Sequence, residues 1–333
     1  MEREYWPTEQ WRSLNKQKNN TQIDKIETMI KEEYSNIKGV AVVKNGYMIY
    51  EKYFNGYGEN DTPTVASVTK SIISALIGIA IDKGYLKSVD EKVMDFFPEY
   101  DFPEDNSIRN EITIKHLLTM TAPYDFPEWQ EPLEKMCMSN DWVKFALSML
   151  GKNGDVGKFK YCTGGTHVLS AIITKVTGKS AREFANENLF KVIGMRQIPY
   201  HEIEEYDYDN ICGKKVRGWV HDPNNFSTGG WGITLTPRDM AKFGYLYLNN
   251  GLWDGKQVIS SKWIKESTEM NSNNYGYLWW LRNDDGIKAN LALGDGGNVI
   301  CYIPEKDFVV AIASEVIPNA KDRGELIKEI MKI

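Results

Sequence analysis

The apolar residues of this chain change their spacing from one region to the next. Between residues 21 and 36 they recur every three or four positions, which predicts a helix with Thr21 as its N-cap. Two short apolar runs follow at 39–43 and 47–53, with Asn45 and Gly46 between them. Because that dipeptide favours a tight turn, the two runs predict a β-hairpin.

Helical spacing dominates the middle of the chain, from about residue 71 to 260. The loop at 54–66 leads into an apolar run at 71–81, which predicts a buried helix. Gly178 is a natural helix stop, and Pro237 suits a first helical turn. Further helices are expected to start near 88 and to span 113–121, 141–150, 165–177 and 236–248.

Strand signals return toward the C-terminus. Four apolar segments alternate with turns, and a final helix is expected from about 319 to 333. Neighbouring strands that follow one another through short turns form antiparallel pairs. We therefore predict an α+β fold, in which an antiparallel sheet built from both termini is flanked by helices and carries a large, mostly helical insertion. The expected C-terminal strands are 277–281, 289–293, 298–303 and 308–313.

The order of these elements predicts one structural unit, and a length of 333 residues suits one large domain with an insertion. We assign all of 1–333 to this unit. Its α/β part covers about 21–80 and 265–333, and the helical insertion covers about 81–264. Residues 1–20 are polar and are expected to form an extended arm.

Composition and charge narrow the classes of function. The chain is 42% hydrophobic and 26% charged, as in ordinary globular proteins, and its net charge of -6 argues against a nucleic-acid surface. No stretch is long and apolar enough to cross a bilayer, and the N-terminus lacks the apolar region of a signal peptide. We therefore expect a cytoplasmic protein, or an exported one if an N-terminal signal has been removed.

The residues that commonly bind metals are scattered along the sequence. The four cysteines match no metal-binding spacing, and the four histidines form no H-E-x-x-H motif. The chain also lacks the G-x-S-x-G nucleophile elbow. We expect reduced cysteines, no metal and no cofactor.

One serine and one lysine lie three residues apart where the loop at 54–66 turns into the apolar helix. At this spacing Ser67 and Lys70 share one face of the helix, one turn apart. A serine hydroxyl becomes a strong nucleophile when a neighbouring base takes its proton, and a buried neutral lysine can be that base. The helix N-terminus also favours negative charge developing at Ser67. The alternative interpretation is a serine cap followed by a solvated lysine.

Two later stretches could complete such a site. Tyr161 and Thr163 lie in a loop directly before a predicted helix, where Tyr161 could move a proton and Thr163 could contact Lys70 or the substrate. The alternative is a core tyrosine with Thr163 as a helix cap. In the second stretch, 293–300, glycines interrupt a strand pattern, which indicates close approach of a ligand or a simple turn.

Taken together, these segments resemble the serine beta-lactamase and penicillin-binding-protein superfamily in its class C-like branch. That branch includes esterases, D-amino-acid peptidases and 6-aminohexanoate-dimer hydrolases. Ser67 to Lys70 resembles the S-x-x-K motif, and Tyr161 to Thr163 resembles Y-x-N. Residues 294–298 lie where the family has K-T-G or H-x-G, and the resemblance runs from about residue 38 to the C-terminus.

The resemblance implies a serine hydrolase that acts on an ester or amide through an acyl-enzyme. Ser67 would be the nucleophile, Lys70 the general base and Tyr161 the proton shuttle. The Ser67 N–H and a strand N–H, from Asp295 or Asn298, would bind the oxyanion. The alternatives are a penicillin-binding D,D-peptidase or beta-lactamase, and a non-catalytic binding protein on the same fold.

Two residues depart from the family pattern. Thr163 replaces the usual Asn, and Asp295 falls where the family has Lys or His. A carboxylate there would repel an anionic substrate, so an ester, an amide or a substrate with a nearby amine fits better than a penicillin. The expected partner is therefore a small ester, amide or peptide-like molecule.

The high aromatic content, 12% of the residues, suits an apolar substrate cleft. Gly296 belongs to the substrate-binding stretch, and Arg217 and His221 could supply positive charge nearby. The aromatic candidates for the cleft walls are Tyr124, Trp129, Trp231 and Trp279.

Overall fold

The computed structural model describes residues 3–14, 20–102, 106–127, 130–271, 273–284 and 286–333. It contains a six-stranded antiparallel sheet in the order β2-β1-β8-β7-β6-β5, with helices on both faces. The N-terminal hairpin therefore lies beside the last strand of the chain. This confirms the predicted α+β fold with a sheet built from both termini. The strands of this sheet are β1 (Ile37–Lys44), β2 (Tyr47–Tyr53), β5 (Trp280–Asp284), β6 (Ile287–Gly294), β7 (Asn298–Ile303) and β8 (Phe308–Ser314).

The two faces of the sheet enter two different cores. On β1, Val40 and Val42 pack with α1 (Asn20–Glu33) and α12 (Gly324–Ile330), whereas Ala41 and Val43 face the core formed with the other helices. This alternation is the period of two that a β-strand imposes on its side chains. It explains why the whole of β1 except its last residue is buried.

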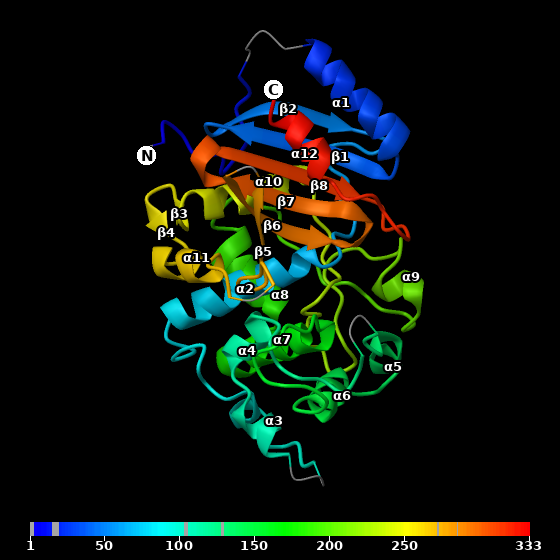
Figure 1. Ribbon diagram of the computed structural model, residues 1–333, viewed down its shortest axis with the longest axis vertical. Coiled ribbons are helices and arrows are strands. Elements are labelled where there is room, and N and C mark those ends of the chain that lie inside the picture. The colour runs from blue at the N-terminus through cyan, green and yellow to red at the C-terminus, as the bar shows by residue number, and fades with distance from the viewer. Residues whose placement is uncertain (1–2, 15–19, 103–105, 128–129, 272, 285) are drawn as a thin grey trace.

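On the second face, α10 (Pro237–Leu248) packs against β8, β7 and β1, and α2 (Val68–Asp82) packs against β6 and β7. The helical part includes α4 (Ile114–Leu118), α6 (Trp142–Met149), α7 (Thr163–Thr177) and α8 (Ala181–Ala185). In Figure 1, α2 runs between the sheet above and the helices α4, α6 and α7 below. The shorter elements are η1 (Val93–Phe96), α3 (Ser107–Glu111), α5 (Leu133–Cys137), η2 (Asn186–Phe190), α9 (Tyr208–Ile211), β3 (Leu252–Trp253), β4 (Lys256–Gln257), α11 (Ser261–Ser267), η3 (Asp295–Gly297) and η4 (Pro304–Lys306).

Several predicted local signals are confirmed. Asn45 and Gly46 both have positive φ, 53° and 83°, as the tight hairpin turn requires. Thr236 caps α10, and its side chain accepts a hydrogen bond from the backbone of Asp239. Gly178 ends α7 in the left-handed conformation.

Other predicted boundaries were wrong by several residues. The helix expected at 113–121 stops at Leu118, because Met120 has a φ of 56° that no helix continues through. The strand expected at 277–281 begins only at Trp280, after a bend at Leu278 with a φ of 60°. Both residues put bulky side chains in the left-handed region, and the pattern of apolar residues carries no signal of such bends.

The chain ends also differ in detail from the predictions. The first helix begins at Asn20, so Thr21 lies inside it rather than at its cap. The final helix begins at Gly324 instead of 319, since Asn319 has a φ of 52°. The helix expected to start near residue 88 is a turn instead, and a short 3₁₀ helix follows it at Val93–Phe96.

The described part of the N-terminal arm, residues 3–14, is docked on the fold. Arg3 forms an ion pair with Asp307, and Ser13 pairs with Met48 on the open edge of β2. Between Arg3 and Ser13, the backbone carbonyl of Thr8 accepts a hydrogen bond from Lys242 on α10.

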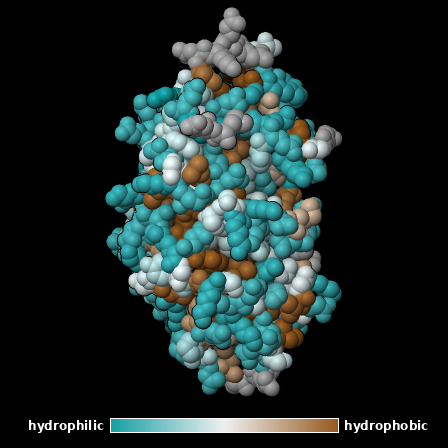
Figure 2. Space-filling view, turned by 90° about the vertical axis from the view of Figure 1, so that its left-hand side faces the viewer, coloured by the Kyte–Doolittle hydropathy of each residue, from teal (hydrophilic) through white to brown (hydrophobic). Residues whose placement is uncertain are grey.

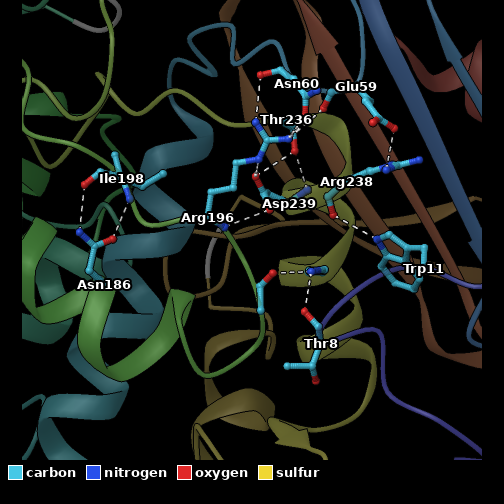
Figure 3. A network of polar contacts seen from close by, with 12 residues as sticks. Thr8, Trp11, Glu59, Asn60, Asn186, Arg196, Ile198, Thr236, Arg238 and Asp239 are labelled. Atoms are coloured by element: carbon cyan, nitrogen blue, oxygen red, sulfur yellow. Dashed lines mark hydrogen bonds and ion pairs between the residues drawn. The ribbon is translucent and has the colours of Figure 1, made fainter.

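Figure 3 shows the network of polar contacts around the start of α10. Asp239 accepts from Thr236 and from the Arg196 backbone, while the Arg196 side chain holds Asn60. Arg238, next to Asp239, pairs with Glu59. The start of α10 is thereby tied to the loop that precedes Ser67.

Hydrophilic side chains cover most of the face shown in Figure 2, and the apolar ones form small separate patches. Among the described residues no helix has the length and hydrophobicity needed to span a membrane. The same residues contain no group of three His, Cys, Asp or Glu side chains arranged to hold a metal ion.

Candidate active site

Ser67 lies at the N-cap of α2, at the end of a sharp turn. The preceding residue, Ala66, has a φ of 48°, which costs a non-glycine residue about 1–2 kcal/mol. Flanking contacts hold this conformation, because the Val65 N–H donates to the Ile233 carbonyl at 3.0 Å. The turn leaves Ser67 partly exposed at the helix N-terminus, while Val65 and Val68 on either side are buried.

Lys70 is buried and directed at Ser67. Its Nζ lies 2.9 Å from Ser67 Oγ and 2.9 Å from the carbonyl oxygen of Gly230. Only 1% of the residue is exposed, so the solvated-lysine alternative does not describe it. A Cβ on Gly230 would lie 3.2 Å from Lys70 Nζ and 2.3 Å from Thr163 Cγ2. A glycine at position 230 therefore leaves the room that the lysine head group needs.

The ring of Tyr161 lies against the Lys70 ammonium group. The Lys70 Nζ is 4.9 Å from the centre of the Tyr161 ring, and that ring stacks on Trp280 at 6.1 Å. Trp280 also contacts Tyr275 edge to face. Burial raises the pKa of the Tyr275 phenol well above its usual range, and the nearby Tyr161 raises it further. The aromatic stack thus fixes the ring of Tyr161 against the lysine.

Thr163 is the first residue of α7, and its N–H donates to Glu131 rather than to solvent. The two oxygens of Glu131 accept from the N–H groups of Thr163 at 2.7 Å and Gly164 at 2.6 Å. A carboxylate at a helix N-terminus satisfies free donors and complements the helix dipole. Glu131 therefore holds the segment that carries Tyr161. The sequence analysis missed this residue, which lies 32 positions from Thr163 without a local motif.

The end of β6 approaches Ser67 through Gly294. A Cβ on Gly294 would lie 2.3 Å from the Val65 carbonyl oxygen and 3.1 Å from the Ser67 nitrogen. No acceptor lies within hydrogen-bonding distance of the Ser67 N–H in the described parts of the chain. Asp295 follows Gly294 directly and begins the turn at this end of β6.

The other two residues predicted in this stretch, Gly296 and Asn298, belong to the lining of the groove beside the turn but are themselves buried. Asn298 is fully buried, and its amide donates to the Asp295 carbonyl at 2.7 Å and accepts from Ser314 N–H at 2.8 Å. Gly296 packs on the backbone of Glu315, whose oxygen would lie 2.5 Å from a Cβ. Both residues shape the turn from its inner side, and Gly294 is the glycine that faces Ser67.

The aromatic residues proposed as cleft walls are mostly core residues. Tyr124 is 1% exposed and packs beneath the start of α7, so it lies away from any open face. Trp231 stacks on Trp142, and Trp279 is enclosed by other aromatic rings. Because all three side chains are buried, they belong to the core and do not form cleft walls. Trp129 lies outside the described residues.

One open groove adjoins the β6–β7 turn, and a second lies near the loop before Ser67. The first, of about 560 Å³, is lined by Gly294 and Asp295, and the second, of about 660 Å³, is lined by Thr64 and Arg217 among others. Tyr208 lines both grooves. His221 lies elsewhere, stacked on Tyr200.

The chain shows the same architecture as several known hydrolases. It is 21% identical over 300 residues to the 6-aminohexanoate-dimer hydrolase of Paenarthrobacter ureafaciens, an alignment that covers 81% of this chain and 70% of the relative. A putative 6-aminohexanoate-dimer hydrolase from Bacillus anthracis superimposes with a TM-score of 0.72 at 22% identity, covering 92% of this chain and 79% of that one. The class C beta lactamase from Rhodobacter sphaeroides gives a TM-score of 0.67 at 16% identity, covering 94% and 99%.

The match to the family extends over nearly the whole sequence. Residues 28–332 fit the sequence profile of the family described as Beta-lactamase. The resemblance inferred from the sequence motifs is thereby confirmed. The chain belongs to the beta-lactamase family, with the fold of its class C-like members.

Proposed function

We propose that the chain is a serine hydrolase that cleaves an ester or amide through an acyl-enzyme, with Ser67 as nucleophile and Lys70 as general base. The observation that carries this proposal is the 2.9 Å contact between the buried Lys70 Nζ and Ser67 Oγ. A base at this distance is within reach of the hydroxyl proton. Membership of a hydrolase family supports the same reaction class.

The reaction begins as Lys70 takes the proton of Ser67 and Ser67 Oγ attacks the substrate carbonyl carbon. The N–H groups of Ser67 and Asp295 bind the oxyanion that forms. Support for this pair of donors comes from Gly294, which brings the end of β6 against the Ser67 nitrogen. The carbonyl bond to the leaving group then breaks, and the acyl group stays on Ser67 as an ester.

Tyr161 handles the second proton transfer. Its ring lies against Lys70, which supports a role for its phenol in passing the proton taken from Ser67 on to the leaving group. Water then attacks the acyl ester, releases the acid and returns the proton to Ser67. Lys70 and Tyr161 act as base and acid in this half-reaction also.

The substrate is an ester or amide that is uncharged or carries an amine near the turn at Asp295. Asp295 is exposed beside the groove and adds negative charge where an anionic substrate would need a cation. The curated relative from Paenarthrobacter ureafaciens is a hydrolase of 6-aminohexanoate dimer, which is consistent with an amide substrate. A D,D-peptidase or beta-lactamase would use the same Ser67 and Lys70, and the substrate panel below separates these activities.

The test combines covalent labelling with turnover. Four proteins are treated with a fluorophosphonate, and their intact masses are measured by mass spectrometry: wild type, Ser67→Ala, Lys70→Met and Ser74→Ala. Ser74→Ala is the control, because it changes a buried serine on the same helix. The same proteins are assayed on aryl esters, amino-acid amides and a chromogenic cephalosporin. Wild type and Ser74→Ala should form one adduct and turn over an ester or amide, and the other two should not. An equal adduct on Ser67→Ala, or no adduct on wild type, contradicts the proposal.

A further inference from the structure

Side chains from other parts of the chain donate hydrogen bonds to the backbone carbonyls of the turn between β6 and β7. The Asp295 carbonyl accepts from Asn298 at 2.7 Å, and the Gly296 carbonyl accepts from Asn36 at 2.7 Å and from Arg323 at 2.8 Å. Arg323 Nε also donates to the Gly297 carbonyl at 3.3 Å. All three carbonyls of η3 are therefore fixed by side chains.

Arg323 is unusual among these groups because it is a buried cation. Only 2% of the residue is exposed, and among the described residues it forms no ion pair with a carboxylate. The Nη2 group that binds the Gly296 carbonyl also contacts the side-chain oxygens of Asn36 and Ser314, and Nη1 donates to the Lys321 carbonyl. Burial of a charge is costly unless its hydrogen bonds are satisfied, and here backbone and neutral side-chain oxygens satisfy them.

Two neighbours also pack against the guanidinium. A Cβ on Gly297 would lie 2.5 Å from Arg323 Cζ, so the glycine backbone lies directly on the group. Arg323 Cζ also lies 5.0 Å from the centre of the Tyr34 ring. Because the guanidinium is planar and rigid, such packing sets the position of the carbonyls that it binds.

The held turn is the one that lies beside Ser67. Peptide groups are planar and trans, so fixing the carbonyls of Gly296 and Gly297 fixes the planes of two successive peptides. The Asp295–Gly296 peptide precedes these two planes, and Asn298 holds its carbonyl. On the other side of Asp295, Gly294 packs on the Ser67 nitrogen. The turn is thus pinned at both ends around the Asp295 N–H.

We propose that Arg323 is a positioning residue for the oxyanion hole, which it serves by holding the β6–β7 turn so that the Asp295 N–H stays beside the Ser67 N–H. The inference rests on the proposed acyl-enzyme function. Arg323 does not touch the substrate, and it acts only through the backbone of Gly296 and Gly297.

The test compares Arg323→Lys and Arg323→Gln with Arg282→Lys. Arg282 is the matched control, since it binds the neighbouring Asp322 and makes no contact with the turn. Each protein is assayed on an ester and on the corresponding thionoester, whose sulfur is a poor hydrogen-bond acceptor. The ratio of the two rates in one sample is independent of the folded fraction, so a variant that is partly unfolded still gives a valid result.

For both Arg323 variants, kcat for the ester should fall by about 10–100-fold, because a displaced oxyanion donor loses most of its effect. KM should change by less than about threefold, and the ester-to-thionoester rate ratio should fall by about tenfold. Arg282→Lys should keep the wild-type ratio. If the Arg323 variants keep it also, the positioning role is refuted while the acyl-enzyme stands. If wild-type Ser67 forms no adduct, the proposed function itself fails.

Discussion

Gly294 and Ser67 are in backbone contact, so close that a methyl group on Gly294 would reach to 3.1 Å from the Ser67 nitrogen. The contact joins the end of β6 to the start of α2, two elements from opposite ends of the chain. It supports the proposal that the backbone N–H groups of Ser67 and Asp295 form a donor pair. An oxyanion hole requires this kind of fixed donor pair.

Gly294→Ala should therefore impair catalysis by steric pressure. Gly294 has a φ of -136°, which alanine adopts readily, but the new Cβ would lie 2.3 Å from the Val65 carbonyl oxygen. We expect a loss of about 1–3 kcal/mol in stability from overpacking and a loss of about 100-fold in kcat from displacement of β6. Steady-state kinetics and thermal unfolding measure both effects. Gly58→Ala is the control, since its Cβ would meet nothing closer than 3.9 Å.

Glu131 should control the position of Tyr161. Replacing it by alanine removes the acceptor of the Thr163 and Gly164 N–H groups at the start of α7. We expect a loss of about 1–2 kcal/mol in stability and a clear fall in kcat. Glu131→Gln keeps one acceptor oxygen and should show a smaller fall. Glu134→Ala, an exposed residue of α5, should match wild type in both assays; a kcat for Glu131→Ala equal to that of Glu134→Ala would disprove the role.

The fold could be predicted because its main signals are local or periodic. Asn45 and Gly46 specify their own turn, and the apolar runs of β1 and β8 show that both strands are buried. The antiparallel order follows from short connections. Bends such as that at Leu278 could not be predicted, because contacts with Ser71 and Leu118 hold that backbone.

The same difference between local and distant contacts decides which parts of the candidate site could be predicted. Ser67 and Lys70 could be predicted because one helical turn brings them together. The carbonyl of Gly230 comes from 160 positions away, and Arg323 from the C-terminal segment, so neither belongs to a local pattern. Tyr124 was misplaced because composition cannot distinguish a core aromatic from a cleft aromatic.

Asp295 should select substrates by charge. We propose a matched series of esters that differ only in a carboxylate, an uncharged or an ammonium group in the acyl part. Asp295→Asn should raise kcat/KM for the anionic ester and lower it for the cationic one by about 2–5-fold each, a small effect because the side chain is exposed. Half-molar salt should remove most of the difference. Asp254→Asn, in the turn between β3 and β4, should change none of the three esters, and an unchanged preference in Asp295→Asn would refute the role.

Glu315 links the end of β8 to two lysines beside the larger groove. Its carboxylate lies 2.6 Å from Lys38 Nζ and 2.9 Å from Lys214 Nζ. The hydrogen bonds from Lys38 and Lys214 hold the pKa of Glu315 below its ordinary value of 4.5. A carboxyl group with a lowered pKa in the folded state stabilises the protein above its unfolded pKa. That contribution is lost as the pH falls through the folded value.

Glu315→Gln should consequently lower the unfolding temperature at pH 7 by about 1–3 °C, as expected for a partly exposed ion pair. The difference from wild type should shrink as the pH is lowered from about 4.5 and vanish once the wild-type carboxylate is protonated in the folded state. Differential scanning calorimetry across this range measures the effect. Glu305→Gln, in the exposed turn after β7, should show no such pH dependence. A difference at Glu315 that stays constant down to pH 2 would show that packing, rather than charge, accounts for the loss.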